Sequence, residues 1–271
     1  MNGASRDALA AARERLDALT DSTSTDAERL AGELAAVTAL LNREVSLRRV
    51  LTDPAQAGEA KAELVQRLLG SQIGGPAADL VSGLVRSRWS QSRDLVDALE
   101  ELADTADLTA AQQADKLDDV EDELFRFARI VSSTTELRAA LTDRKATAAA
   151  KGELLRSLLG GRADAATVRL VTRLVTAPRG RSLEAGLESL SKLAAERRDR
   201  VVAVVTSAVP LSDTQKQRLG AALAKLYGRR MHLNLDVDPD VVGGIRVQVG
   251  DEVINGSLAD RLEDAARRMA S

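Results

Sequence analysis

A repeat at an offset of ninety residues is the feature that most constrains how this chain can fold. The segment LRRVLTDPAQAGEAKAELVQRLLG (residues 47–70) aligns without a gap with LRAALTDRKATAAAKGELLRSLLG (residues 137–160). Continued to residue 85, the alignment contains 16 identities in 39 positions. Two copies are too few for a solenoid, and each copy has about the size of a small domain. The repeat therefore predicts two related bundles in tandem, with Leu68 and Leu158 at equivalent core positions.

Both copies have the hydrophobic spacing of amphipathic helices. In the first copy, residues 26–51 place one apolar stripe at helical intervals, made of Leu30, Leu34, Val37, Leu40 and Leu41. Thr25 and Glu28 have the spacing of a capping box at the start of this helix. A further helix is expected after Asp53-Pro54, with Asp53 as its cap, and Gly70 is expected to end it in a left-handed conformation.

The pattern changes near residue 200. RVVAVVTSAVPL is a β-branched run typical of a buried strand, and Ser212 with Gln215 predicts a capped helix after it. Apolar residues then alternate with polar ones over 231–237 and 245–249, which predicts further strands. A last helix is expected from Ser257. The glycines among these strands lack the spacing of a dinucleotide or phosphate loop, so we interpret them as turn residues.

The predicted fold class is therefore mainly α, with two tandem related helical bundles followed by a small C-terminal α/β domain. The predicted domain limits are 1–107 for the first bundle, 108–196 for the second bundle and 197–271 for the C-terminal domain.

Composition argues against several classes of function. A net charge of −3 and a pI near 5.5 give no basic field for nucleic acid, and the chain has only four aromatic residues for stacking on bases. The absence of cysteine excludes disulfides and thiolate chemistry and fits a reducing compartment. The N-terminus has arginines where a signal peptide needs an apolar core, so we expect a cytoplasmic protein.

No cluster in the sequence has the pattern of an active site. His232, Asn234 and Asp236 share one strand face, but one imidazole and one carboxylate make a weak metal site, and a solvated face explains them better. The carboxylates of residues 114–124 fit a solvated helix start, with an acidic contact surface as the alternative. The basic segment 195–200 is most simply solvated, and Trp89 is most simply a packing residue. We therefore predict no catalytic residues, no cofactor and no metal.

The C-terminal region resembles a known family. VVAVVTSAVPLSDTQKQRL and LNLDVDPDVVGGIRVQVGDEVINGSLADRL are similar to the δ subunit of the F-type ATP synthase, whose mitochondrial relative is the oligomycin-sensitivity-conferring protein. The residues that carry the resemblance are Thr206 to Leu211, Asp238, Val241, Gly243, Gly244, Ile245, Val247 and Gly250. The resemblance covers residues 108–271. Family members usually have one bundle, whereas this chain has two, as in the long actinobacterial form.

The resemblance implies a peripheral-stalk protein without chemistry of its own. It implies a bundle that packs against N-terminal segments of α subunits on the α₃β₃ head, and a C-terminal domain that binds the b subunits. It also implies a place on the cytoplasmic face of the bacterial plasma membrane, with membrane association through the complex.

The residues expected to contact partners are Leu9, Leu80, Leu84, Val171, Leu174, Val241, Val242, Leu258 and Leu262. Val242 is expected on the surface, with a core position as the alternative. Two other readings stay open: an enzyme whose glycine-rich domain binds a nucleotide, and a helical adaptor unrelated to the synthase.

Overall fold

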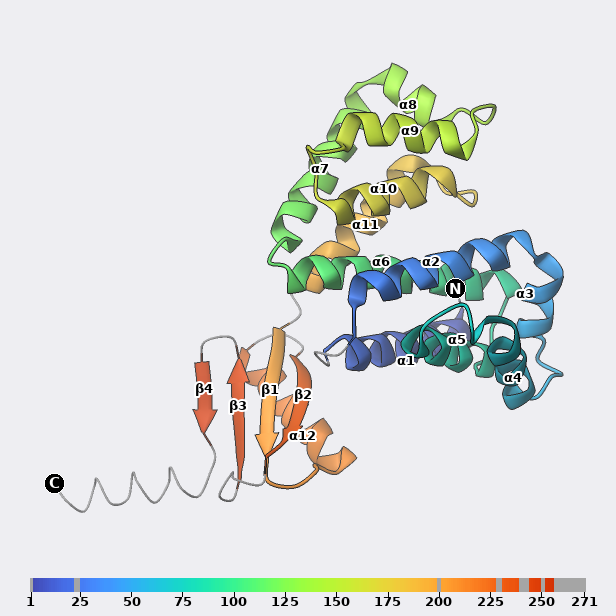
Figure 1. Ribbon diagram of the computed structural model, residues 1–271. Coiled ribbons are helices and arrows are strands. Elements are labelled where there is room, and N and C mark those ends of the chain that lie inside the picture. Colours follow the sequence, from blue (N-terminus) through green and yellow to red (C-terminus); the bar gives the residue numbers. More distant parts are fainter. Residues whose placement is uncertain are drawn as a thin grey trace, which may run out of the picture. The chain divides into compact units, whose positions relative to one another are not determined.

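The chain folds into two compact units, Met1–Arg197 and Arg198–Ser271. The computed structural model describes residues 2–21, 25–198, 201–227, 231–238, 244–249 and 252–255 (Figure 1). The first unit is entirely helical within these residues, and the second contains a small sheet with one described helix. This confirms the predicted fold class, mainly α with a small C-terminal α/β part.

The helices of the first unit repeat the ninety-residue offset of the sequence. The first half contains α1 (Gly3–Thr20), α2 (Ala27–Arg43), α3 (Val45–Thr52), α4 (Gly58–Leu69), α5 (Gly75–Arg86) and α6 (Ser92–Gln113). The second half contains α7 (Leu117–Ser133), α8 (Thr135–Thr142), α9 (Ala148–Leu159), α10 (Ala165–Thr176) and α11 (Leu183–Arg198). Each of α7 to α10 begins and ends ninety residues after its counterpart among α2 to α5, so the structural repeat follows the sequence repeat.

The prediction for Leu68 and Leu158 was wrong. The two residues hold equivalent places, one before the end of α4 and of α9, but Leu68 is 44% exposed and Leu158 only half-buried. Val65 and Leu155, three residues earlier, are the equivalent pair that is buried. A run of two leucines at a helix end does not show which one faces the core; in α4 it is Leu69, four residues after buried Val65.

The ninety-residue offset also maps α1 onto residues 93–110, which lie within α6. Helix α6 is therefore the last helix of the first bundle and takes the place of the first helix in the second. Figure 1 shows α6 running beside α2 and continuing into α7. The position between residues 107 and 108, where we predict a domain limit, lies inside this continuous helix.

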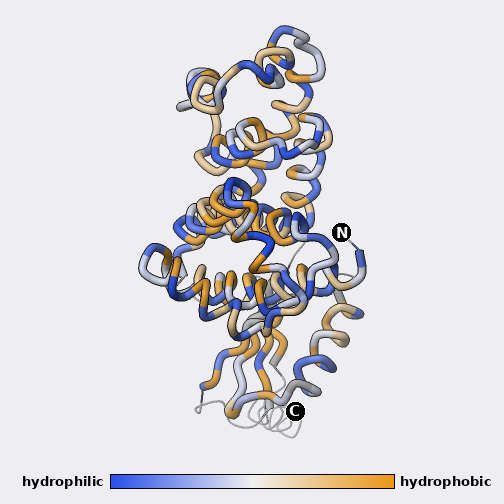
Figure 2. The backbone as a smooth tube through the Cα atoms, turned by 90° about the vertical axis from the view of Figure 1, so that its right-hand side faces the viewer, coloured by the Kyte–Doolittle hydropathy of each residue, from blue (hydrophilic) through white to orange (hydrophobic). Residues whose placement is uncertain are grey.

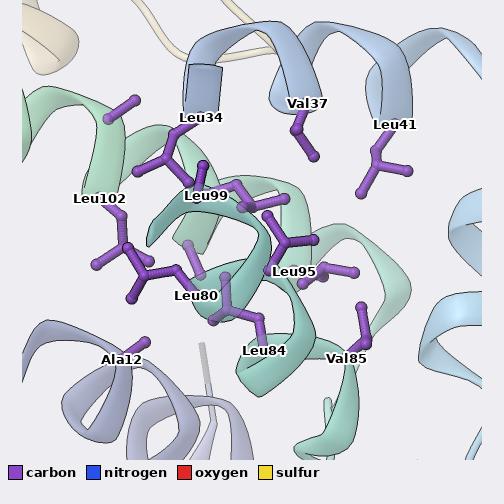
Figure 3. Close-up of a cluster of buried hydrophobic side chains, with 14 of the residues drawn as sticks. Ala12, Leu34, Val37, Leu41, Leu80, Leu84, Val85, Leu95, Leu99 and Leu102 are labelled. Carbon is purple, nitrogen blue, oxygen red and sulfur yellow. The ribbon is translucent and has the colours of Figure 1, made fainter. Parts of the chain in front are cut away.

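Each bundle has its own hydrophobic core. The first core contains buried side chains from Ala8 to Ala106, and the second from Leu108 to Ala194. In Figure 3, leucines and valines of α2, α5 and α6 meet inside the first bundle: Leu34, Val37, Leu41, Leu80, Leu84, Val85, Leu95, Leu99 and Leu102. Along the helices of Figure 2, hydrophobic residues in orange alternate with hydrophilic residues in blue, as amphipathic helices require.

Three of the predicted helix ends differ in detail. The side chain of Asp26, rather than Thr25, caps α2 by accepting a hydrogen bond from the Arg29 backbone N–H at 3.0 Å. Aspartate caps as well as threonine, and here it has the same spacing to the third residue of the helix. Asp53 follows the end of α3, and α4 begins only at Gly58.

Gly70 is not left-handed, since its φ is −60°. Glycine is needed there for another reason: a Cβ at this position would lie 2.5 Å from the carbonyl oxygen of Gln66. The same holds at Gly160, where a Cβ would lie 2.5 Å from the carbonyl oxygen of Arg156.

The second unit contains a four-stranded sheet. Its strands are β1 (Val201–Ser207), β2 (Met231–Val237), β3 (Ile245–Val249) and β4 (Glu252–Asn255), in the order β2-β1-β3-β4. β1 is parallel to β2 and antiparallel to β3, and β4 is antiparallel to β3. The parallel pair is joined through α12 (Asp213–Tyr227), which packs on β2. The predicted capping box is confirmed: Ser212 N–H donates to Gln215 Oε1 at 2.9 Å, and Ser212 Oγ accepts from the Gln215 N–H.

The core of this unit is small. Val205, Leu223 and Val247 are its buried residues, and half-buried aliphatic side chains from β2, β3, β4 and α12 pack around them. Along β3, buried Val247 lies between exposed Arg246 and Gln248, which confirms the predicted alternation.

A close helix contact in the second bundle gives a test of the packing. A Cβ on Gly186 of α11 would lie within 3.0 Å of three carbons of the buried Leu174 side chain. Gly186→Ala would add about 1 kcal/mol of helix propensity but overpack the core at a cost of about 1–3 kcal/mol. We expect a lower free energy of unfolding in urea.

Gly83→Ala in α5 is the matched control, because a Cβ there meets no atom within 4 Å. We expect this variant to be as stable as the wild type or more stable, by up to about 1 kcal/mol. Equal stabilisation by both alanines would contradict the close contact at Gly186.

Candidate functional site

The predicted partner-contact residues of the helical unit lie inside its cores. Leu9 of α1 and Leu80 and Leu84 of α5 belong to the first core, while Val171 and Leu174 of α10 belong to the second. All five are buried. These leucines and valines form the apolar faces that pack inside the bundles. A partner protein would therefore first contact the exposed residues beside them on the same helices. A role for these five residues in partner binding stays a prediction.

The predicted contact residues of the second unit, Val241, Val242, Leu258 and Leu262, lie outside the described residues. So do Gly243, Gly250, Gly256 and the helix expected from Ser257. Gly244 is described, and its φ of +99° is a conformation that only glycine adopts readily.

The most unusual feature of the helical unit is the second face of α6. One face of this helix supplies leucines and alanines to the first core. The other face carries four acidic side chains at spacings of three and four residues, so that they share one side of the helix: Asp97, Glu100, Asp104 and Asp107. This acidic face meets α10 and the loop between α10 and α11.

Arginines from the second bundle pair with each acid of that face. Arg173 Nε donates to Asp104 Oδ1 at 2.8 Å, and its Nη2 donates to Asp107 Oδ2 at 2.5 Å. Arg169 Nε donates to Asp107 Oδ1 at 2.7 Å. Through a second nitrogen, Nη1, Arg169 also pairs with Glu28 of α2 at 2.8 Å. These bonds join α6, α10 and α2 in one network.

The loop after α10 completes the network. Arg181 Nη2 donates to Glu100 Oε2 at 2.5 Å, and Arg179 pairs with the same carboxylate and with Asp97. Arg179 has a φ of +48°, in the left-handed region that non-glycine residues rarely occupy. Its side chain is only 5% exposed.

The acids of α6 are withdrawn from water to an unusual degree. The Asp107 side chain is 0% exposed, and Asp104 and Glu100 are also buried. Burial is the largest of the effects that together raise the pKa of Asp104 to about 7; Arg173 lowers this pKa, and the neighbouring Glu100 and Asp107 raise it. Ionised carboxylates in such a place need the arginines, so these ion pairs fix how α10 lies on α6.

A groove runs beside this network, between the two bundles. It has a volume of about 360 Å³ and is lined mainly by small side chains. From α2 it takes Ala35, Thr38, Ala39 and Asn42, and from α10 it takes Val168, Thr172 and Thr176, with Arg169, Arg173 and Glu100 at one side.

Exposed aliphatic and aromatic side chains occur in both units. In the helical unit they are Val45, Val50, Leu68, Phe125 and Ile130. In the second unit they include Val209, Leu226, and, on the two edge strands, Val237 and Val253.

The other sequence candidates have structural places. Trp89 is buried and donates through Nε1 to the carbonyl oxygen of Leu84 at 2.8 Å. In the acidic segment, Glu123 accepts hydrogen bonds from the Asp164 backbone and the Thr167 hydroxyl. Asp236 is exposed, while nothing is described of the His232 and Asn234 side chains.

Within the described ranges, no three His, Cys, Asp or Glu side chains are grouped closely enough to bind a metal ion. In the same part of the chain, no helix is both long enough and apolar enough to span a membrane.

The acid and arginine network was missed by sequence reasoning, although the sequence carries a signal for it. Asp97, Glu100, Asp104 and Asp107 follow one helical face, and the two copies differ in charge at the partner positions. Arg169 and Arg173 of the second copy stand where the first copy has Asp79 and Gly83. A comparison of charges between the copies would have indicated that α10 meets an acidic surface.

Comparison with known proteins gives consistent matches. The family model "ATP synthase delta (OSCP) subunit" matches residues 104–269. "ATP synthase subunit delta" of Streptomyces coelicolor is 82% identical over all of this chain and 99% of the relative. The proteins of that name from Thermobifida fusca and Acidothermus cellulolyticus are each 48% identical, over the full length of both chains.

Removing one arginine tests whether the network joins the bundles. Arg173→Met keeps the length of the side chain but leaves Asp104 and Asp107 without their shared cation. Above pH 7, where Asp104 is ionised in the wild type, we expect the free energy of unfolding to fall by about 3–5 kcal/mol, the usual cost of removing one partner of a buried ion pair. Arg126→Met is the control, because Arg126 and its partner Asp122 are both exposed, and should change stability by less than about 0.5 kcal/mol. Similar small losses for both variants would refute the role of Arg173.

The raised pKa of Asp104 predicts a pH dependence of stability. The folded chain holds this proton up to about pH 7, whereas an unfolded aspartate has the ordinary value of 3.8. The contribution of Asp104 to stability therefore falls as pH rises between these values, by at most about 1.4 kcal/mol per pH unit.

Asp104→Asn does not titrate, so it isolates this contribution. We expect the stability of the wild type relative to Asp104→Asn to decrease from about pH 5 to about pH 8, measured by thermal unfolding. A relative increase would show that pairing with Arg173 outweighs burial.

Proposed function

Because the chain belongs to the ATP synthase delta (OSCP) subunit family, we propose that it is a non-catalytic peripheral-stalk subunit of the F-type ATP synthase. In this role it links the α₃β₃ catalytic head to the membrane-anchored b subunits, so that the head does not turn with the rotor. Proton-driven rotation is then coupled to ATP synthesis. The proposed place is the cytoplasmic face of the plasma membrane, reached through the complex.

The division of the chain into two compact units carries this proposal. A linker between two bodies needs two binding regions that fold separately, and the chain has a helical unit and an α/β unit with separate cores. The exposed apolar side chains of each unit give it a surface of its own for a partner.

The junction inside the helical unit also fits a stator. A stalk must resist the torque of the rotor, and a flexible joint between the bundles would absorb it. Helix α6 passes through the junction without a break, and the buried arginines allow only one pairing geometry. Two bundles fixed in this way would transmit force as one rigid body.

We assign the α subunit N-terminal segments to the helical unit and the b subunits to the C-terminal unit. The helical unit offers grooves between helices, the form of site that accepts an amphipathic partner helix. In the C-terminal unit, the proposed b contact includes the Val241-Val242 segment beside Gly244. The predicted limits 1–107, 108–196 and 197–271 remain part of this proposal.

A variant at Gly244 tests the division of roles in the full chain. Its φ of +99° costs a β-branched residue about 1–3 kcal/mol in strain. We expect Gly244→Val to weaken binding of a soluble b-subunit segment at least tenfold and to leave binding of an α N-terminal peptide unchanged. Gly220→Ala in α12, where a Cβ makes only an ordinary contact, is the control. Equal binding of b by Gly244→Val, measured by calorimetry, would remove this segment from the interface.

The function as a whole is tested on membranes stripped of this subunit. Adding back the wild-type chain should restore proton-coupled ATP synthesis, and the isolated chain should show no ATP hydrolysis. Synthesis that is unchanged without the subunit would refute the proposal.

A further inference from the structure

The basic segment 195–200, which the sequence suggests to be solvated, contains a buried arginine. Arg197 lies in the last turn of α11, and its side chain is only 5% exposed. Arg198, the next residue, is exposed. A guanidinium keeps its positive charge when it is buried, so it needs hydrogen-bond partners there. Burial of Arg197 therefore points to a specific contact at this end of α11.

Two partners of Arg197 lie on α1 and α6. Its Nη1 donates to Asp17 Oδ1 of α1 at 2.8 Å, and its Nε donates to Gln112 Oε1 of α6 at 2.6 Å. The ends of α1 and α6 are themselves joined, because Gln113 Nε2 donates to the carbonyl oxygen of Thr20 at 2.9 Å. Figure 1 shows α11 reaching the end of α6 that leads into α7. We call the two hydrogen bonds of the Arg197 side chain the Arg197 contact.

The repeat shows what is special about this position. Asp17, Asp107 and Arg197 follow one another at intervals of ninety residues, so they are equivalent positions of α1, α6 and α11. The position is acidic in the first two helices and basic in the third. Asp107 pairs with arginines of α10, whereas Asp17 pairs with Arg197. The reversed charge in α11 thus supplies a cation to the first bundle.

Arg197 also lies where the chain leaves the helical unit. The two compact units divide after this residue, α11 ends at Arg198, and β1 begins at Val201. A force that acts on the C-terminal unit therefore reaches the last turn of α11 first. Helix ends open most easily, because their last carbonyl groups have no partner within the helix. Leu190 and Ala194 anchor α11 in the second core, and the Arg197 contact adds a connection to the first bundle.

We propose that Arg197 is a positioning residue through which the first bundle shares the mechanical load of the stalk, an inference that rests on the proposed function. Force from the C-terminal unit enters the second core through the buried side chains of α11, and it enters α1 and α6 through the Arg197 contact. The two hydrogen bonds leave the guanidinium toward different helices, so the end of α11 cannot slide along either helix without breaking one of them.

Spin labels test whether Arg197 holds the end of α11 on the first bundle. The chain has no cysteine, so cysteines at exposed Ala18 of α1 and exposed Glu196 of α11 give two unique labels in the full chain. Dipolar EPR spectroscopy should show one narrow distance distribution when Arg197 is present. Arg197→Met should raise the detached population by about tenfold or more, because it removes two hydrogen bonds of a charged group.

Lys192→Met is the matched control, because Lys192 is an exposed cation of the same helix, and this variant should keep the narrow distribution. An unchanged distribution in Arg197→Met would overturn the proposal. So would an equally broad distribution in the Lys192 variant.

Charge reversal separates this role from a general loss of stability. Asp17→Arg combined with Arg197→Asp re-forms the ion pair, and the Gln112 amide group can donate to the new carboxylate. On membranes stripped of the subunit, Arg197→Met should support coupled ATP synthesis as the wild type does at low proton-motive force. It should lose more of this activity as the proton-motive force rises, because the torque on the stalk rises with it.

The reversed pair should restore both the narrow distance distribution and synthesis at high proton-motive force. Failure of this rescue would count against the Arg197 contact, and an equal loss of synthesis at every proton-motive force would indicate a merely structural role. If the wild type restores synthesis and Arg197→Met equals it throughout, this inference fails while the proposed function stands. If the wild type itself restores no synthesis, both fail.

Discussion

A helix buried on two sides by two different kinds of chemistry organises the larger part of this protein. Toward the first bundle, α6 offers leucine and alanine, and toward the second it offers aspartate and glutamate, with Leu108 and Ala111 near its C-terminal end. Apolar packing needs only shape and tolerates small rotations, whereas buried carboxylates need arginine nitrogens at hydrogen-bond distance. The first bundle thus gains stability from its contact with α6, and the second gains a fixed orientation. Replacing the acids by leucines could hold the bundles together equally strongly, but it would remove the requirement for one geometry.

Much of the fold could be predicted from the sequence because the two copies give independent evidence for the same helix boundaries. Leu-Thr-Asp and Leu-Leu-Gly recur at the same offset as the helix ends, and the alternation in the C-terminal third gives the strands. The errors are local ones. Asp26 and Thr25 are both good caps, and two adjacent leucines at positions 68 and 69 compete for one inward direction. Such choices are decided by packing against other helices, which a single helix pattern does not contain.

The junction between the bundles could not be predicted in the same way. A repeat suggests that each copy is complete, so it hides a helix that serves both copies. The acidic stripe of α6 also looks like the solvated face of any amphipathic helix until Arg169 and Arg173 are seen to face it. The predicted contact residues illustrate the opposite problem, because Leu80 and Val171 are apolar for the sake of their own cores. Exposed Phe125 was passed over, although its counterpart in the first copy is alanine.

The shared helix has a consequence for the order in which the protein forms during synthesis. Domains fold from the N-terminus as the chain leaves the ribosome, and the first bundle has all its helices once Gln113 has emerged. At that stage α6 is already folded in the first bundle, and the second bundle then packs against its free face. Until Arg169 and Arg173 are synthesised, most of that surface of α6 exposes ionised carboxylates to water, and only Leu108 and Ala111 near its end are apolar. A partly synthesised chain therefore exposes a mostly charged surface, which does not promote aggregation with other nascent chains.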